Sequence, residues 1–322
     1  MKTQLDLAPL QLLGLRRADA SNRGRRLDKA HLALVLEGGG MRGIVSVSMA
    51  AALEQEGYYD AFDSIHGSSA GACGGAYFAA KQATLGTTVY YEDINNRHFI
   101  DLMRWARGRP IMDTDFLINK ILRKRKPLNV KTIVDTPGLM HVVVTDIDTY
   151  ASLSISHFLD PDDFFAVLKG SICLPLIAGY QVKARGRRYF DGGVSQHLAV
   201  NSAVAAGATH IILLMTRPED QLIRPDDRTS ISFDSLALGF VYGAKMKAMF
   251  DKRNKTINET VTSAHIGYLA PRIRMCGIAR AAGATAVSRL TTNEGLLRAA
   301  AREGREAVLQ AFSRRIVIKD LC

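Results

Sequence analysis

The stretch LALVLEGGGMRG, residues 32–43, is an apolar run of five residues followed by a glycine-rich turn. An uninterrupted apolar run of this length is typical of a strand that is covered on both faces. Residues 44–56, rich in Ala, Met and Leu, favour a helix after the turn. The same order then recurs, with a strand candidate at 62–66, a Gly/Ser turn, and a helical pattern at 70–81. Two strand–turn–helix units in succession predict a parallel α/β sheet.

Strand patterns return only after a long segment that lacks them. Residues 82–135 are interpreted as a helical insertion or cap, and the C-terminal third, including 296–312, as mainly helical. Residues 1–30 are polar and basic, which indicates a partly ordered, flexible arm. We interpret 31–322 as one domain with its core motifs within 32–215. Further strands are expected at 141–145, 151–157 and 210–215, with a helix at 164–170 and a hairpin at 180–190.

The composition is that of an ordinary globular protein, with 322 residues, 47% hydrophobic and 23% charged. No apolar stretch reaches the ~18 residues that span a bilayer, and the N-terminus does not resemble a secretory signal. Four widely scattered cysteines, without metal-ligand spacing, favour reduced thiols, a cytoplasmic location and no metal site. The net charge of +11 is compatible with nucleic acid or anionic lipid headgroups. It is spread over short runs such as 23–26 and 123–126, which are usually solvated faces.

The first motif that carries chemistry is Gly38–Gly43, between a strand and a helix. It formally satisfies the dinucleotide pattern G-x-G-x-x-G, which needs an acidic residue about twenty positions on, at the end of the second strand. Asp60 and Asp63 lie at that distance but precede or open the next strand. Alternatively, consecutive glycine amides at a helix N-terminus can form an oxyanion hole. A third interpretation is a tight turn without further function.

The second motif is G-x-S-x-G at Gly67–Gly71, again between a strand and a helix. This setting is typical of a nucleophile elbow, which makes Ser69 the candidate nucleophile and leaves Ser68 pointing elsewhere. A serine nucleophile needs a base. Three histidines follow later in the chain. His210 opens a strand, where a packing role is favoured, and His197 and His265 have no distinguishing surroundings. Asp191-Gly192-Gly193 offers a carboxylate instead, in what is by itself a generic turn.

The order of these motifs resembles the patatin-like phospholipase family over about residues 32–215. Gly170–Pro175 adds to the resemblance, being similar to the family's A-S-x-x-x-P block. Departures are Gly170, where the family usually has Ala, and His66, where a small or apolar residue is commoner. The resemblance implies a three-layer α/β/α fold and a Ser–Asp dyad without histidine. It implies Ser69 as nucleophile, Asp191 as general base, Gly38, Gly39, Gly40 and Arg42 as the oxyanion hole, and Gly43, Gly67, Gly71, Gly192 and Gly193 as motif glycines.

The function expected from this resemblance is ester hydrolysis on acyl lipids, without a metal or cofactor. Two alternatives remain open: acyl transfer by the same dyad, and a nucleotide-binding or non-catalytic regulatory protein on the same fold. We expect no nucleic-acid partner. The basic runs at 104–109 and 123–126 predict peripheral contact with an anionic membrane surface, at the inner face of the membrane.

Overall fold

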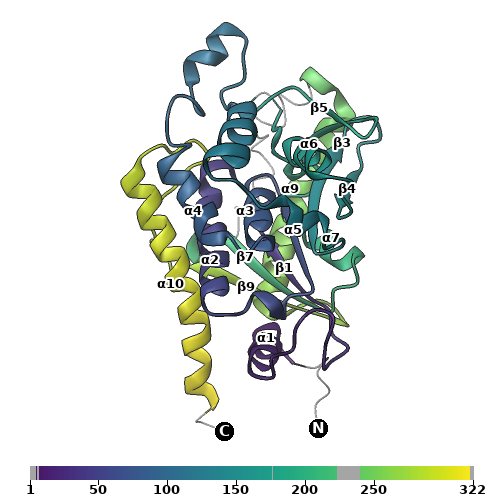
Figure 1. Cartoon of the computed structure of the whole chain (residues 1–322), viewed down its shortest axis with the longest axis vertical. Coiled ribbons are helices and arrows are strands. Elements are labelled where there is room, and N and C mark those ends of the chain that lie inside the picture. Colours follow the sequence, from purple (N-terminus) through teal and green to yellow (C-terminus); the bar gives the residue numbers. More distant parts are fainter. Residues whose placement is uncertain (1–4, 6, 176, 223–239, 320–322) are drawn as a thin grey trace.

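The computed structural model describes residues 5, 7–175, 177–222 and 240–319. A mixed sheet of nine strands lies at the centre of this part of the chain, in the order β5-β6-β3-β2-β1-β7-β9-β8 with β4 beside β3 (Figure 1). The series β3-β2-β1-β7-β9 is parallel, and the remaining pairings are antiparallel. The strands are β1 Leu32–Leu36, β2 Ser64–Ser68, β3 Met140–Asp146, β4 Ser152–Ile155, β5 Val182–Ala184, β6 Arg187–Asp191, β7 His210–Pro218, β8 Tyr268–Ala270 and β9 Ile273–Arg280.

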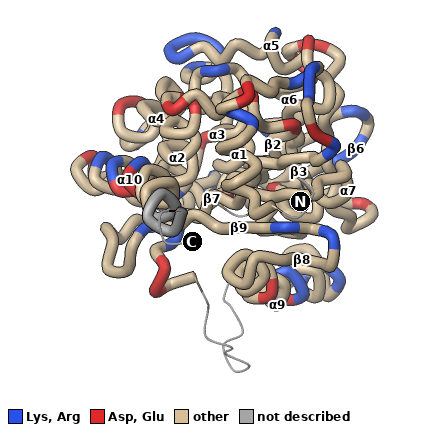
Figure 2. The backbone as a smooth tube through the Cα atoms, turned by 90° about the horizontal axis from the view of Figure 1, so that it is seen from below, with Lys and Arg blue, Asp and Glu red and all other residues tan. Residues whose placement is uncertain are grey.

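Helices cover both faces of this sheet. Figure 2 shows α2, α3 and α6 on one side of β7 and β9, with α9 on the other. Along β1, Leu32, Leu34 and Leu36 join the core that holds α2 and α10, whereas Ala33 and Val35 pack with α7 and α9. The fold is therefore a three-layer α/β/α sandwich with a mainly parallel sheet. The strand–turn–helix pattern predicts the parallel sheet, and the family resemblance implies the three layers. The α-helices include α1 Pro9–Ala18, α2 Ile44–Gln55, α3 Ala70–Ala79, α4 Ala83–Glu92, α5 Val130–Val134, α6 Pro161–Ile172, α7 Val200–Ala205, α9 Ala244–Ile266 and α10 Glu294–Lys319.

The strand register brings the sequence motifs to one level of the sheet. Leu36, the last residue of β1, is level with Gly67 on β2. The next residue of β2, Ser68, is level with Val143 on β3. The next β3 residue, Val144, is level with Asp191 at the end of β6. The glycine loop (Gly38–Gly43), the elbow (Gly67–Gly71) and Asp191 therefore meet at one edge of the sheet, although β6 runs antiparallel to β3.

The predicted helical insertion is present, while other boundaries differ. It contains α4, the 3₁₀ helix η4 Leu102–Arg107, the π-helix η5 Phe116–Arg125, and α5. Strand β2 begins and ends later than the predicted 62–66. The view of the C-terminal third as mainly helical missed β8 and β9, and β9 is a parallel neighbour of β7. Two arginines within β9 dilute its apolar pattern, and one of them, Arg280, is buried because it pairs with Glu303.

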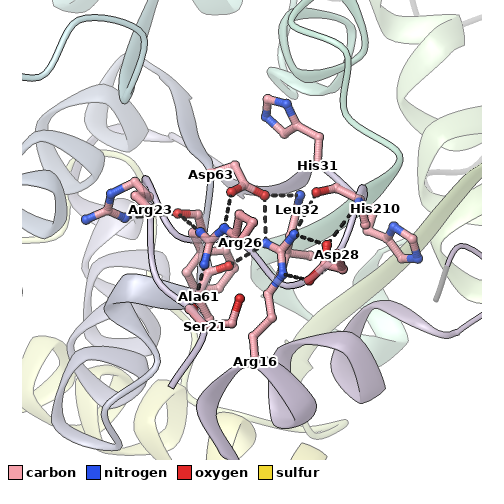
Figure 3. Close-up of polar contacts among 12 residues, drawn as sticks. Arg16, Ser21, Arg23, Arg26, Asp28, His31, Leu32, Ala61, Asp63 and His210 are labelled. Atoms are coloured by element: carbon pink, nitrogen blue, oxygen red, sulfur yellow. Dashed lines mark hydrogen bonds and ion pairs between the residues drawn. The ribbon is translucent and has the colours of Figure 1, made fainter. Parts of the chain in front are cut away.

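The segment that was expected to be a partly ordered arm packs against the sheet. Helix α1 contacts β7 and β9. Its Arg16 is only 2% exposed and donates to both carboxylate oxygens of Asp28, to Asp63, and to two backbone carbonyls (Figure 3). A buried guanidinium is tolerated when its donors all find acceptors in this way. The sequence pattern alone does not show these partners, because Asp63 is remote from Arg16 along the chain.

The basic run 23–26 is likewise not simply a solvated face. Arg23 and Arg26 both donate to the carbonyl of Phe62, and Arg26 also pairs with Asp63 (Figure 3). Arg25 alone in this run has its side chain largely exposed without a salt bridge among the described residues. Part of the positive charge counted in the sequence is therefore used to attach the N-terminal segment.

Candidate active site

Ser69 sits at a sharp turn between β2 and α3. Its backbone angles are φ 55° and ψ −133°, a conformation that a side-chain-bearing residue rarely adopts. The flanking glycines make this turn possible. A Cβ on Gly67 would lie 2.4 Å from the carbonyl oxygen of Gly71, and one on Gly71 would lie 2.3 Å from that of Leu36. The turn has the shape of a nucleophile elbow, with Ser69 only half-buried at its apex.

The block at Gly170–Pro175 supports this elbow from α6. The Ser69 amide donates to both the carbonyl and the hydroxyl oxygen of Ser171, each at 3.1 Å. The Ser171 hydroxyl in turn donates to the carbonyl of Val143 at 2.7 Å. Ser68, the neighbouring serine, directs its hydroxyl toward the carbonyls of Gln196 and His197 at 3.5 Å. The two adjacent serines therefore have different surroundings, and Ser69 is the one that occupies the N-cap position of α3.

Asp191 lies at the end of β6 and is 2% exposed. Its carboxylate accepts hydrogen bonds from the Ser69 hydroxyl and from the Gly193 amide, the latter at 2.7 Å. Burial raises the pKa of Asp191 to about 6, although both hydrogen bonds act to lower it. A carboxylate of this pKa, in contact with a serine hydroxyl, has the properties of a general base near neutral pH.

The glycine loop after β1 lies directly against the elbow. A Cβ on Gly38 would be 3.1 Å from that of Ser69, while Gly39 and Gly40 have φ of 137° and 58°, values that suit glycine. The Met41 amide donates to the carbonyl of Arg289. Within the described ranges, the amides of Gly38, Gly39 and Gly40 donate to no other protein group. Three unused amides beside a serine match the donor set of an oxyanion hole.

A cavity of about 450 Å³ joins these groups, since its walls include Gly38–Gly40, Ser69 and Asp191. Its volume falls within the range of sites for small molecules. A smaller space of about 60 Å³ shares Ser69 and Met112 with it and continues between α3, α4 and η5. The walls of the smaller space are almost entirely apolar; they include Cys73, Tyr77, Val89, Tyr90, Phe99, Leu117 and Leu122.

A buried pair behind the glycine loop was not predicted from the sequence. Glu37 accepts from His197 Nε2 at 3.1 Å and from the Thr216 amide at 2.6 Å. Burial alone would raise the pKa of Glu37, but the hydrogen bond and charge of His197, with the charge of Arg42, hold it at about 2. One sequence feature does point to this pair: Glu37 is a charged residue placed directly between a buried strand and Gly38. His197, which belongs to no sequence motif, lines the cavity of about 450 Å³.

Arg42 lies on the same side of the glycine loop as Glu37, since both contact Thr216. Its Nε donates to the Thr216 hydroxyl at 3.2 Å, and a Cβ on Gly39 would come within 3.0 Å of its Nη2. The guanidinium therefore packs against the back of the loop. The structure supports a positioning role for Arg42 more directly than a role as an oxyanion donor.

Replacing Glu37 with glutamine is expected to lower the free energy of unfolding by about 1.5–3 kcal/mol at neutral pH, the usual worth of a hydrogen bond to a charged group. The pKa of Glu37 is depressed, so its contribution is full above the ordinary value of 4.5 and is lost as the pH falls toward 2. Urea unfolding of both proteins across this acid range measures the difference. A difference that does not shrink on acidification would contradict the assignment of a charged Glu37.

The remaining candidates lie away from this site. Asp63 binds Arg16 and Arg26, and Asp60 lies near Arg23, all at the edge where β2 begins. These contacts give no support to a dinucleotide site, which would need the acid at the opposite edge of the sheet.

The other histidines also lie away from the dyad. The ring of His66 bonds to Ser64 and Ser202 on the α7 side of the sheet, and burial lowers the pKa of His66 well below the usual value. His210 is buried and bonds to Leu7, and His265 is exposed on α9. Within the described ranges, no group of three or more His, Cys, Asp or Glu is placed to hold a metal ion.

Fold and site together define an α/β/α protein with a nucleophile elbow and an acidic partner for its serine. The family model for patatin-like phospholipases matches residues 34–204, more than half of the chain. The chain therefore belongs to the patatin-like phospholipase family, a family of lipid-hydrolase type.

Two curated relatives match parts of the chain. "Uncharacterized protein YjjU" of Escherichia coli (strain K12) is 28% identical over 207 residues, which is 62% of this chain and 56% of YjjU. "1-acylglycerol-3-phosphate O-acyltransferase Pnpla3" of Mus musculus is 33% identical over 111 residues, 32% of this chain and 26% of Pnpla3. The chain thus spans about half of the first relative and about a quarter of the second. The crystal structure of VipD from Legionella pneumophila aligns with a TM-score of 0.45 at 14% identity, covering 87% of this chain and 66% of VipD.

Proposed function

We propose that this protein is a serine acyl hydrolase that cleaves carboxylic esters of acyl lipids through an acyl-enzyme on Ser69, with Asp191 as general base. One observation carries the proposal. The Ser69 hydroxyl, at a strained elbow, donates to a buried carboxylate whose pKa is raised to about 6. Family membership supports the reaction class, and the apolar walls behind Ser69 support the acyl substrate.

In the first half of the reaction, Ser69 Oγ attacks the ester carbonyl carbon while its proton passes to the Asp191 carboxylate. The carbonyl oxygen becomes an oxyanion, which the amides of the glycine loop stabilise. The C–O bond of the ester then breaks, and the leaving alcohol takes the proton from Asp191. The acyl chain remains on Ser69.

In the second half, water attacks the acyl-enzyme and gives a proton to Asp191. The oxyanion forms again beside the same amides and collapses, so that the carboxylic acid leaves and Ser69 regains its proton. The N-terminus of α3 points at Ser69 and favours negative charge there. The dyad needs no histidine for this cycle, since one carboxyl group accepts and returns each proton.

The apolar space between α3, α4 and η5, about 60 Å³ in volume, is suited to the first carbons of the acyl chain. That space opens beside Ser69 and is lined by side chains such as Val89, Phe99 and Leu122. The larger cavity, with Asp191, Arg253 and Arg289 in its walls, is the more polar side and suits the alcohol portion of the ester. Apolar burial of this kind contributes about 0.8 kcal/mol per methylene.

Acyl transfer is a second candidate, because the relative Pnpla3 carries the name of an acyltransferase. The same acyl-enzyme gives transfer when an alcohol attacks in place of water. One assay distinguishes acyl transfer from hydrolysis. Adding a soluble alcohol during ester cleavage yields a new ester if transfer operates, and only free acid if hydrolysis dominates.

The pH dependence of the wild-type reaction tests the role of Asp191. The carboxylate must be ionised to accept a proton, and burial raises its pKa to about 6. We therefore expect kcat/KM for p-nitrophenyl ester hydrolysis to rise as the pH rises through about 6 and then to level off. Initial rates in constant-ionic-strength buffers give the profile. A midpoint near the ordinary aspartate pKa of 3.8, or near 8, would argue against Asp191 as the base.

A further inference from the structure

A loop beside the catalytic cavity exposes apolar side chains to an unusual degree. We call residues 101–111 the Trp105 loop. Within it, Leu102, Met103 and Trp105 are 63%, 62% and 70% exposed. Large apolar side chains gathered in this way indicate an interaction surface more often than a solitary exposed residue does.

The base of the Trp105 loop is held firmly. Ile100 and Met112 form an antiparallel bridge where the two ends of the loop meet. The Asp101 amide donates to the carbonyl of Ile111 at 3.0 Å. Nearer the tip, the Tyr180 hydroxyl donates to the carbonyl of Gly108 at 2.9 Å. The exposed side chains are thus presented on an ordered support.

A second apolar segment lies close to the first. Phe240 is 94% exposed, and its near neighbour Tyr242 donates a hydroxyl to the carbonyl of Tyr180 at 3.5 Å. Tyr180 therefore contacts both segments. In Figure 1 the blue loop at the top and the light green turn of helix before α9 project from the same end of the molecule, opposite the chain termini.

This apolar surface borders the entrance to the candidate active site. Trp105 and Ile111 are wall residues of the 450 Å³ cavity that also contains Ser69. Across the cavity, Phe250 and Arg253 of α9 are wall residues too. A molecule that covers the Trp105 loop therefore lies directly at the mouth of the cavity.

The charge around the loop has one dominant sign. Residues 97–109 contain four arginines and a single acid, Asp101, which caps η4 through the Met103 amide. Arg104 donates to carbonyls of its own segment and lies 3.6 Å from Asp113. Arg107 and Arg109 are exposed, and within the described residues neither forms a salt bridge. Two cations are thus available on the loop itself.

The other basic run, 123–126, differs in this respect. Arg123 pairs with Asp162, and Arg125 pairs with Asp93. Lys126 also pairs with Asp93, at 3.0 Å. These contacts neutralise most of that run. Of these two basic runs, only the one at 104–109 retains exposed arginines that form no salt bridge among the described residues and lie next to apolar side chains.

We propose that the Trp105 loop and Phe240 form a docking surface for an anionic lipid bilayer, placing the cavity mouth against the membrane. Tryptophan with flanking arginines suits the headgroup region, where the ring enters the interface and the cations meet lipid phosphates. A second copy of the chain fits less well, because two such loops would bring like charges together. The inference rests on the proposed function for its purpose, since an acyl-lipid hydrolase needs access to its substrate in the bilayer.

The sequence provides a direct probe, because Trp105 is the only tryptophan. The full chain carrying Ser69→Ala is titrated with vesicles of phosphatidylcholine with or without phosphatidylglycerol, so that binding is read without hydrolysis. We expect tryptophan emission to shift to shorter wavelength with the anionic vesicles at low salt, and the shift to be reversed at about 0.5 M salt. Neutral vesicles should produce a much smaller shift.

Matched variants then locate the surface by vesicle sedimentation. Arg107→Gln with Arg109→Gln is expected to weaken partitioning to anionic vesicles by about 10-fold or more. Arg25→Gln with Lys29→Gln removes the same charge before the start of β1, at the opposite end, and should leave partitioning unchanged. With active protein, the loop variant should keep its rate on a soluble p-nitrophenyl ester while losing rate on vesicles. Loss on both substrates would point to a fault in the site and not in docking.

Three results would overturn the proposal. The first is an unchanged emission spectrum with anionic vesicles at low salt. The second is equal partitioning of the two double variants. The third is an emission maximum that depends on protein concentration without lipid, together with a dimer in light scattering, which would assign the surface to a second copy of the chain. If wild type hydrolyses no ester yet these binding results hold, the proposed function fails and the docking surface stands.

Discussion

Replacing Ser69 with alanine is expected to lower kcat for ester hydrolysis by about 10⁴–10⁶-fold, the loss seen when an enzyme is deprived of its covalent nucleophile. The hydroxyl is the only part of the side chain that this change removes, and the elbow itself is maintained by flanking glycines and by Ser171. The variant should therefore fold and retain its thermal midpoint. Rates with a medium-chain p-nitrophenyl ester, together with thermal unfolding, separate a chemical loss from a structural one.

The neighbouring serine is the natural control for this experiment. The hydroxyl of Ser68 faces the carbonyls of Gln196 and His197 and not the carboxylate of Asp191. Ser68→Ala should stay within about 10-fold of the wild-type rate, because it removes at most one weak, long hydrogen bond. Equal losses in the two variants would mean that Ser69 has no special role.

Replacing Asp191 with asparagine is the second large effect. A positioned general base contributes about 10²–10⁴-fold, so kcat should fall by that factor. The amide oxygen can still accept from the Gly193 amide, which at present donates at 2.7 Å. The variant should also lose the rise in rate as the pH increases through about 6, because the group that titrates there is absent. Rate profiles of both proteins over the same pH range measure the two effects together.

The same variant has an opposite consequence for stability. Asp191 has a folded-state pKa of about 6, above its ordinary 3.8, so its contribution to stability is full below 3.8 and is lost as the pH rises through 6. Asparagine never ionises and avoids this loss, which amounts to about 1–3 kcal/mol at neutral pH. Denaturant unfolding should show Asp191→Asn to be the more stable protein at neutral pH, with the difference vanishing in acid. A variant that is both less active and less stable at neutral pH would point to a structural role for Asp191.

Much of the fold could be predicted from short patterns. The apolar run at 32–36 and the glycine turns imply strand–turn–helix units, because their signals are local. Strand β9 was missed because its burial comes from remote partners, such as Glu303 for Arg280. The N-terminal segment was misjudged for the same reason. Arg16 is buried by acids that the chain brings to it only after folding.

The candidate site shows the same division. Motifs indicated Ser69, Asp191 and the glycine loop, and the register of β2, β3 and β6 brings them together. The pair of Glu37 and His197 was not found, because the two residues are far apart in the sequence and neither belongs to a motif. Glu37 and His197 are brought together by the pairing of β1 with its neighbouring strands and by the course of the chain after β6. No local sequence pattern encodes either of these.

The most direct test of the account is covalent labelling. A fluorophosphonate reacts with an activated serine, and peptide mass spectrometry of the labelled full-length protein identifies the residue that carries the adduct. We predict one adduct, on Ser69, formed faster above pH 6 than below it, absent in Ser69→Ala and strongly slowed in Asp191→Asn. An adduct that forms on another residue, or that persists unchanged in Ser69→Ala, would contradict the assignment of Ser69 and Asp191 as a catalytic dyad.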